Sequence, residues 1–217
     1  YPLAGYVTGG LTALLLYLLP APPLVLAAAG IAVIFILTGC NHLDGLLDLG
    51  DGLMAHGGRD VRIRALTDRT IGTGGIACGS LVILLTFGSL ASCPVPWIAV
   101  IVAEVLSRYA MALMTIFGRP FHDGLHATLH SKAKTWFVIP GALLILPLGF
   151  LPVDSAVIGL SLFVVLAVTG SLLGIATRLF GGVNGDVCGS LGEISRALVL
   201  AVFACFTAGA GGLPLLL

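Results

Sequence analysis

Three aspartates follow one another at helical spacing in an otherwise apolar chain. Asp44, Asp48 and Asp51 lie within residues 41–52, and on a helix with about 100° per residue they fall within an arc of roughly 60°. Three carboxylates on one stripe repel one another, so the spacing favours a bound cation. Hard oxygen ligands suit Mg²⁺ or Mn²⁺ better than zinc. The pattern predicts a magnesium site; the alternative is a solvated acidic cap at the end of a membrane span.

Basic side chains and a glycine-rich turn follow the acids. Four arginines lie between residues 59 and 69, and a guanidinium group can bind two phosphate oxygens at once. Beside a metal site, they predict a diphosphate clamp in which Arg59 and Arg69 take part; the alternative for each arginine is an anchor to lipid headgroups. The turn at residues 68–75 leads into a span, and its backbone N–H groups could hold an anion.

Polar residues also occur at two places far from the acids. Asn184 and Asp186, with Glu193 just beyond, could ligate metal or bind ribose hydroxyls; the alternative is an ordinary turn. Glu104 and Arg108 are spaced i,i+4 well inside an apolar stretch, so they can pair on one helix face. That pair is either a structural ion pair or the floor of a site, because charges within the membrane are costly.

The composition indicates that a membrane must position these residues. The chain is 58% hydrophobic and 9% charged, with a mean hydropathy of +1.13, whereas soluble domains carry roughly a quarter charged residues. A bilayer-crossing helix needs about 20 mostly apolar residues. Such stretches, two of them short, occur near residues 2–19, 22–40, 71–92, 95–117, 135–152, 155–177 and 194–216. We predict an all-α fold, a polytopic integral membrane helix bundle with about seven transmembrane helices, forming a single domain over residues 1–217.

The charged residues are distributed unevenly between the two sides of this bundle. Nine of the ten Lys and Arg residues, and all five histidines, lie in or beside the loops 41–70, 118–134 and 178–193. The positive-inside rule places these loops in the cytoplasm, with the active site among them. A net charge of zero argues against nucleic-acid binding. A transporter, which would need polar residues near mid-membrane and repeated halves, is the alternative from another class.

At these motifs the sequence resembles cobalamin synthase, the adenosylcobinamide-GDP ribazoletransferase family. The matching segments keep the family's order through essentially the whole chain, and they are residues 42–52, residues 68–75, Ser107-Arg108 and residues 181–193. The first of them, HxDGxxDxxDG, is quite specific. The chain departs from the family at Thr70, His126 and Arg196, where an arginine, a glycine and a second acid are usual. The family also has a few tens of residues before this start, so an N-terminal segment is expected to be missing.

The resemblance implies the reaction and its partners. Adenosylcobinamide-GDP is joined to α-ribazole, or to α-ribazole 5′-phosphate, and GMP is released, in the cell membrane with the active site facing the cytoplasm. The implied cofactor is Mg²⁺, with Mn²⁺ as an alternative. The lipid bilayer is a further partner, nucleic acid is not, and a homo-oligomer is left open.

A mechanism that fits this reaction gives each candidate residue a role. The metal ligands are Asp44, Asp48 and Asp51; the group that accepts the proton of the attacking ribose hydroxyl is Asp68 or His42; and the substrate-binding residues are Arg59, Arg69, Arg108, Asn184, Asp186 and Glu193.

A second membrane transferase family shares part of the acidic motif. Asp48-x-x-Asp51-Gly52-x-x-Ala55 resembles the start of the signature of CDP-alcohol phosphotransferases, which make phospholipid headgroups. That signature continues with an arginine where this chain has His56, and its closing pair of aspartates is absent. This family is therefore the weaker alternative.

Overall fold

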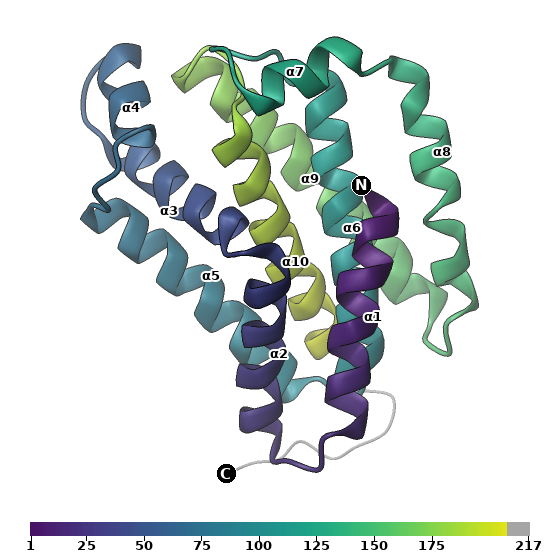
Figure 1. Cartoon of the computed structure of the whole chain (residues 1–217). Coiled ribbons are helices and arrows are strands. Elements are labelled where there is room, and N and C mark those ends of the chain that lie inside the picture. The colour runs from purple at the N-terminus through teal and green to yellow at the C-terminus, as the bar shows by residue number, and fades with distance from the viewer. Residues whose placement is uncertain (208–217) are drawn as a thin grey trace.

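Helices make up almost all of the described chain, residues 1–207 of a computed structural model (Figure 1). In chain order they are α1 (Pro2–Leu18), α2 (Pro23–Thr38), α3 (Asn41–Met54), α4 (Arg59–Leu66), α5 (Thr73–Ser92), α6 (Pro96–Phe117), α7 (Leu125–Lys132), α8 (Val138–Leu143), α9 (Ser155–Leu179) and α10 (Gly185–Thr207). Short 3-10 turns, η1 (Thr135–Phe137) and η2 (Leu146–Phe150), flank α8. The predicted all-α bundle is confirmed.

Four of these helices, α5, α6, α9 and α10, are long and apolar enough to cross a bilayer without interruption. Two further candidates are bent: the pair α2–α3, and the segment from α7 to η2. If each of these is one span, residues 1–207 contain six candidate spans. Helix α1, with 17 residues, is shorter than the others. The expected number of about seven is thus corrected to between four and six. The stretch 135–152 is broken because Pro140 and Pro147 lack the N–H that continues a helix.

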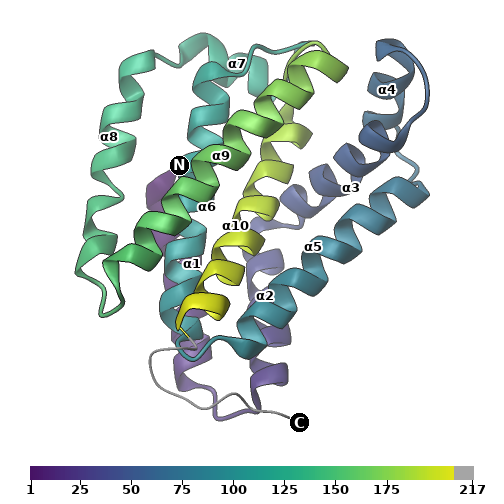
Figure 2. The same ribbon diagram turned by 180° about the vertical axis from the view of Figure 1, so that it is seen from behind.

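The central helices are α6 and α10. Within the most apolar part of each helix, 78% of α6 and 72% of α10 are buried, against 33% for α5 and for α9. Figures 1 and 2 show these two helices surrounded by α1, α2, α5 and α9. A polar side chain on the inner face of α6 or α10 is therefore shielded from both water and lipid.

Helix α3, which carries the acids, runs nearly perpendicular to α2. α3 is turned by 94° from α2, and the turn is made by two residues in the left-handed region, Gly39 at φ +60° and Cys40 at φ +58°. A glycine in this conformation commonly ends a helix. Asn41 secures the corner by donating from Nδ2 to the carbonyl oxygen of Thr38 at 3.0 Å. α3 thereby leaves the direction of α2 and packs against two of the uninterrupted spans, α5 and α10.

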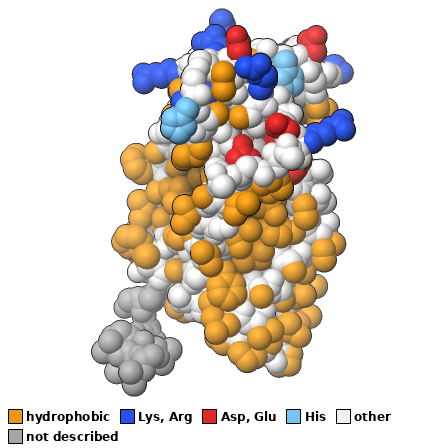
Figure 3. All heavy atoms as spheres, turned by 90° about the vertical axis from the view of Figure 1, so that its left-hand side faces the viewer, with side chains coloured by type: hydrophobic (Ala, Val, Ile, Leu, Met, Phe, Trp, Pro, Cys, Tyr) orange, Lys and Arg blue, Asp and Glu red, His pale blue; other side chains and the backbone are white. Residues whose placement is uncertain are grey.

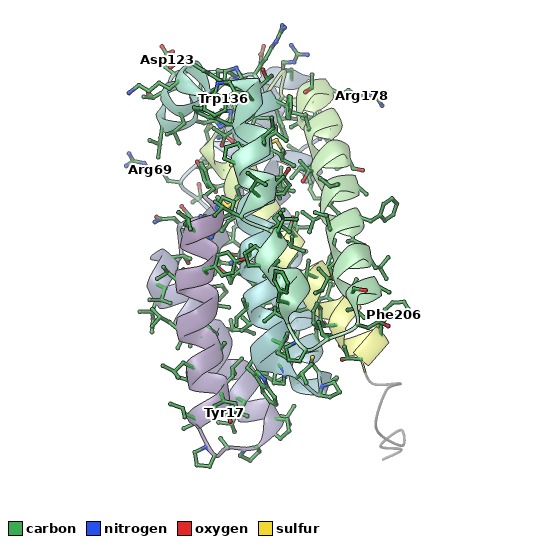
Figure 4. The ribbon with its side chains drawn as sticks, turned by 90° about the vertical axis from the view of Figure 1, so that its right-hand side faces the viewer. Tyr17, Arg69, Asp123, Trp136, Arg178 and Phe206 are labelled. Atoms are coloured by element: carbon green, nitrogen blue, oxygen red, sulfur yellow. The ribbon has the colours of Figure 1, made fainter. Side chains whose placement is uncertain are left out.

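Charged groups gather at one end of the bundle, as the sequence predicts. Figure 3 shows Lys, Arg, His and acidic side chains at one end of the face formed by α3, α4 and α5, with apolar side chains covering the rest. In Figure 4, Asp123 and Arg178 lie at that end, while Tyr17 and Phe206 lie toward the other.

All three predicted loops contain helical residues. The helix expected at 194–216 begins at Gly185, so residues 185–193 are its first turns and not a loop; residues 208–216 lie outside the described residues. The predicted loop 41–70 contains α3 and α4, and the loop 118–134 contains α7.

Candidate active site

The acidic stripe lies on α3, as its spacing predicts, but its three members have different surroundings. Asp44 is exposed, whereas Asp48 and Asp51 are half-buried. The carboxylate of Asp51 accepts from the backbone N–H of Gly72 at 2.7 Å and of Gly75 at 2.8 Å. These donors are unpaired N–H groups at the start of α5, so Asp51 caps that helix. The anion site expected in this turn is therefore partly filled by the chain's own carboxylate.

A fourth acid, Asp186, joins the stripe from the first turn of α10. Burial, together with the neighbouring carboxylates of Asp186, Asp44 and Asp51, raises the pKa of Asp48 to about 7. Since carboxylates shift one another's pKa only at short range, the acids of α3 and Asp186 share one electrostatic site. The sequence suggested Asp186 as a substrate or metal ligand, and the structure places it beside the stripe.

The two acidic helices approach each other through a glycine. A Cβ added to Gly45 would lie 2.7 Å from the carbonyl oxygen of Asp186 and 2.8 Å from its Cα, so only glycine permits this backbone contact. Ser190 Oγ donates to the carbonyl oxygen of Gly45 at 2.8 Å across the same contact. The separation of the carboxylates is thus set by backbone packing between α3 and α10.

Asn184 positions Asp186. Its Oδ1 accepts from the backbone N–H of Val187 at 3.0 Å, which makes it the cap of α10. Its Nδ2 donates to Asp186 Oδ2 at 2.6 Å. Asn184 is almost fully buried, with 2% of its surface exposed. Its side chain therefore positions Asp186 and does not face an open substrate surface.

Asp68 lies exposed in the loop before α5, and one of its two carboxylate oxygens is bound locally. Its Oδ1 accepts from the hydroxyl of Thr70 at 2.6 Å and from the backbone N–H of Thr70 at 3.1 Å, and these hydrogen bonds lower its pKa. An open pocket of about 310 Å³ brings Asp68 and Asp51 together at the start of α5. Asp68 therefore faces the same solvent-filled region as the acidic stripe.

The arginines that follow α3 lie in three different settings. Arg62 donates from Nη1 to the carbonyl oxygens of Leu53 at 2.7 Å and Gly52 at 3.3 Å, so it caps α3. Arg59 is exposed, and its guanidinium group lies against Gly181, where a Cβ would be 3.0 Å from Nη1. Arg69 is also exposed and points away from the helices in Figure 4. Of the predicted clamp, Arg59 is the arginine with a contact to a second loop within residues 1–207, at Gly181.

Beneath the acids lies a chain of buried charges. Glu104 accepts from Arg108 Nη2 at 3.2 Å and from Nε of Arg196. Arg196 Nη1 also contacts Glu193 Oε2 at 2.5 Å, and Arg108 Nη1 lies 3.0 Å from Nδ1 of His42. Arg108 and Glu193, expected to bind substrate, are thus 6% and 3% exposed within this network.

Arg196 was not among the predicted site residues. Its i,i+3 spacing from Glu193 would have indicated the pair had α10 been expected to begin at Gly185.

Comparison with known proteins gives one consistent result. The sequence model of the family described as cobalamin-5-phosphate synthase matches residues 1–204. The chain is 35% identical to the adenosylcobinamide-GDP ribazoletransferase of Methanosarcina mazei over 94% of this chain and 80% of the relative. It is 38% identical to that of Deinococcus radiodurans (94% and 73%) and 34% identical to that of Thermococcus onnurineus (98% and 89%). No solved structure matches the chain.

Proposed function

This chain belongs to the cobalamin-5-phosphate synthase family, and we propose that its acidic end holds the active site in which adenosylcobinamide-GDP is joined to α-ribazole or to α-ribazole 5′-phosphate. The activity is that of an adenosylcobinamide-GDP ribazoletransferase, the final step of cobalamin synthesis. The observation that carries the placement is the backbone contact at Gly45, which brings Asp186 of α10 against the helix that holds the other acids.

Magnesium is the proposed cofactor, and the chemistry of the donor set supports it. Asp44, Asp48 and Asp186 offer hard carboxylate oxygens whose mutual repulsion a divalent cation would relieve. Within residues 1–207, no three His, Cys, Asp or Glu side chains are close enough to hold an ion as they stand, so side-chain rotation would have to bring the carboxylates together. When bound, Mg²⁺ supplies charge neutralisation on the diphosphate. Asp51 keeps one free lone pair on each oxygen and can complete the site.

Other residues of the chain bind the phosphates and accept the proton. Arg59, held against Gly181, binds phosphate oxygens, and Arg69 can reach them only by turning back toward the site. A ribose hydroxyl of α-ribazole attacks the phosphorus on the corrinoid side, a new P–O bond forms, and the bond to GMP breaks. Asp68 or His42 accepts the hydroxyl proton.

The charged end is proposed to face the cytoplasm. The chain is a multi-pass membrane protein by its apolar helices, and the gathering of Lys and Arg at one end supports the cytoplasmic side for that end. Both substrates are water-soluble, so an active site at this end of a protein in the cell membrane would be open to them.

The test is product formation by the detergent-purified protein. With Mg²⁺, adenosylcobinamide-GDP and α-ribazole should give GMP and a cobalamin product, and chelation of the metal should stop the reaction. Asp48→Asn should lower kcat at least about 100-fold, because it removes a charge that faces the diphosphate's metal. Asp60→Asn, which changes an exposed acid on α4, is the matched control and should keep full activity. Folded wild-type protein that forms no GMP with Mg²⁺, or a fully active Asp48→Asn variant, would contradict the proposal.

A further inference from the structure

We propose that a pocket between α1, α6, α7 and α8 binds an anionic phospholipid, with the headgroup phosphate on Lys132 and part of an acyl chain against α6. Helix α8 and the helix of the acids, α3, lie on opposite sides of the bundle in Figures 1 and 2. The pocket is therefore separate from the candidate active site. The inference goes beyond the proposed function and does not depend on it.

The pocket is an open cavity of about 350 Å³ with a mostly apolar lining. Ile116 of α6, Leu129 of α7 and Phe137 of η1 contribute apolar side chains, and Thr115 contributes a hydroxyl. That hydroxyl donates to the carbonyl oxygen of Met111 at 2.8 Å, so it needs no partner from a ligand. The volume is that of a small-molecule site, and the lining suits an acyl chain.

The pocket extends from the charged end toward the membrane interior. Pro2, at the start of α1, lines it. About 6 Å further along α1, the hydroxyl of Tyr6 donates to the carbonyl oxygen of Leu144, just beyond α8, at 2.8 Å. This contact joins the two helices and closes the inner end of the pocket. An acyl chain would therefore leave sideways, where Ile139 and Leu143 of α8 are exposed.

Lys132 supplies a positive charge at the rim of the pocket. Among the described residues that line the pocket, it alone has a charged side chain, and it is exposed. The ion pairs within residues 1–207 all belong to the buried network of Glu104 and Glu193, so no carboxylate there neutralises Lys132. Basic pockets between membrane helices bind anionic headgroups in this way. Lys132 also lies in the last turn of α7, where a cation stabilises the helix end, and the test separates the two roles.

Aromatic side chains place this rim at the level of the lipid headgroups. Trp136 and Phe137 are both exposed, and their rings meet edge to face with centroids 4.6 Å apart. Figure 4 shows Trp136 near the charged end, and tryptophan is enriched at the boundary between membrane and water. Exposed apolar side chains around the opening favour a lipid over a water-soluble phosphate.

The test measures the fluorescence of Trp136 in the whole protein, purified in detergent. Trp97→Phe removes the other tryptophan of the sequence, which lies beside Tyr17 near the far end of the bundle. Phosphatidylglycerol with brominated acyl chains, which quench tryptophan on contact, is then added in small amounts. We expect saturable quenching of Trp136. Brominated phosphatidylcholine should need an amount about fivefold higher or more, as the loss of one lysine–headgroup attraction predicts.

Two pairs of variants locate the site. Lys132→Gln should raise the amount of phosphatidylglycerol for half-maximal quenching about fivefold. Lys134→Gln removes an exposed lysine that does not line the pocket and is the matched control, so it should leave that amount unchanged. Ala112→Phe fills the wall of the pocket and should weaken quenching at an unchanged thermal midpoint, whereas Leu125→Phe, on the exposed face of α7, should not.

Three results would overturn the inference. Equal quenching by the two lipids would show that the pocket does not select an anionic headgroup. Equal effects of Lys132→Gln and Lys134→Gln, or no effect of either, would remove the role of Lys132. Relief of quenching by excess inorganic phosphate would assign the pocket to a water-soluble phosphate. GMP release plays no part in this test, so a failure of the proposed function would leave its outcome unchanged.

Discussion

Gly45→Ala should lower the activity of the enzyme strongly although it adds a single methyl group on a helix. The new Cβ would lie 2.7 Å from the carbonyl oxygen of Asp186 and 3.1 Å from its carbonyl carbon, both backbone atoms that cannot rotate away. To open the 2.7 Å separation to the 3.4 Å of ordinary contact, α3 and α10 have to move apart by about 0.7 Å. This displacement acts directly on the distance between Asp186 and the acids of α3.

The expected size of the effect follows from that displacement. A misplacement of about 1 Å at a reacting centre costs roughly 100-fold in rate, so we expect kcat/KM to fall about 10- to 100-fold. Stability should change less, because overpacking costs about 1–3 kcal/mol while alanine is favoured over glycine in a helix by about 1 kcal/mol. A large loss of activity with a small loss of stability is the predicted signature.

The assay follows GMP release by purified protein in detergent, together with the thermal midpoint. Gly88→Ala on α5 is the matched control, because a Cβ there meets nothing within 4 Å, and it should leave both quantities near those of wild type. Gly45→Ala with wild-type kcat/KM and an unchanged midpoint would refute the argument that backbone contact between α3 and α10 sets the geometry of the acids.

Three further predictions concern the surroundings of the acids. Asp51→Asn should destabilise the protein by about 1–3 kcal/mol, because an amide replaces one of the two acceptor oxygens that pair with Gly72 and Gly75; an unchanged thermal midpoint would contradict the cap. Arg62→Ala should lower the midpoint by the equivalent of about 1–2 kcal/mol, since it removes the donor to the end of α3, while Arg64→Ala, on an exposed side chain, should not. Removal of divalent ions with a chelator should abolish GMP release, and Mn²⁺ should restore part of it; activity that survives chelation would contradict the cation site.

The sequence predicted the membrane helices well because their signal is local. Runs of about 20 apolar residues identify α5, α6 and α9 nearly to their ends. The start of α10 was missed because the polar residues 185–193 interrupt the apolar pattern, and that turn of helix depends on the cap by Asn184 and the contact of Ser190 with α3. The break at 135–152 was missed because hydropathy does not register the two prolines.

The candidate site was predictable to the extent that it lies on one helix. The 3.6-residue period placed the acids on one face of α3, and the structure has them there. The roles that depend on distant partners could not be read from spacing: Asp51 meets its donors 21 and 24 residues later, and Arg196 meets Glu104 across 92 residues. Asn184, Arg108 and Glu193 were identified as site residues, but their contacts place them behind the site rather than at its surface.

The backbone contacts of α3 also determine how the site can open. Its main chain meets neighbouring main chains directly, at Asp186 through Gly45 and at the start of α5 through Gly50, where a Cβ would lie 2.7 Å from the carbonyl oxygen of Gly74. Contacts of this kind have no side chain that can rotate to make room. Parting α3 from α5 or α10 would therefore mean moving whole helices, so we expect a large corrinoid to reach the acids from the open pocket at the start of α5 and not from between the helices.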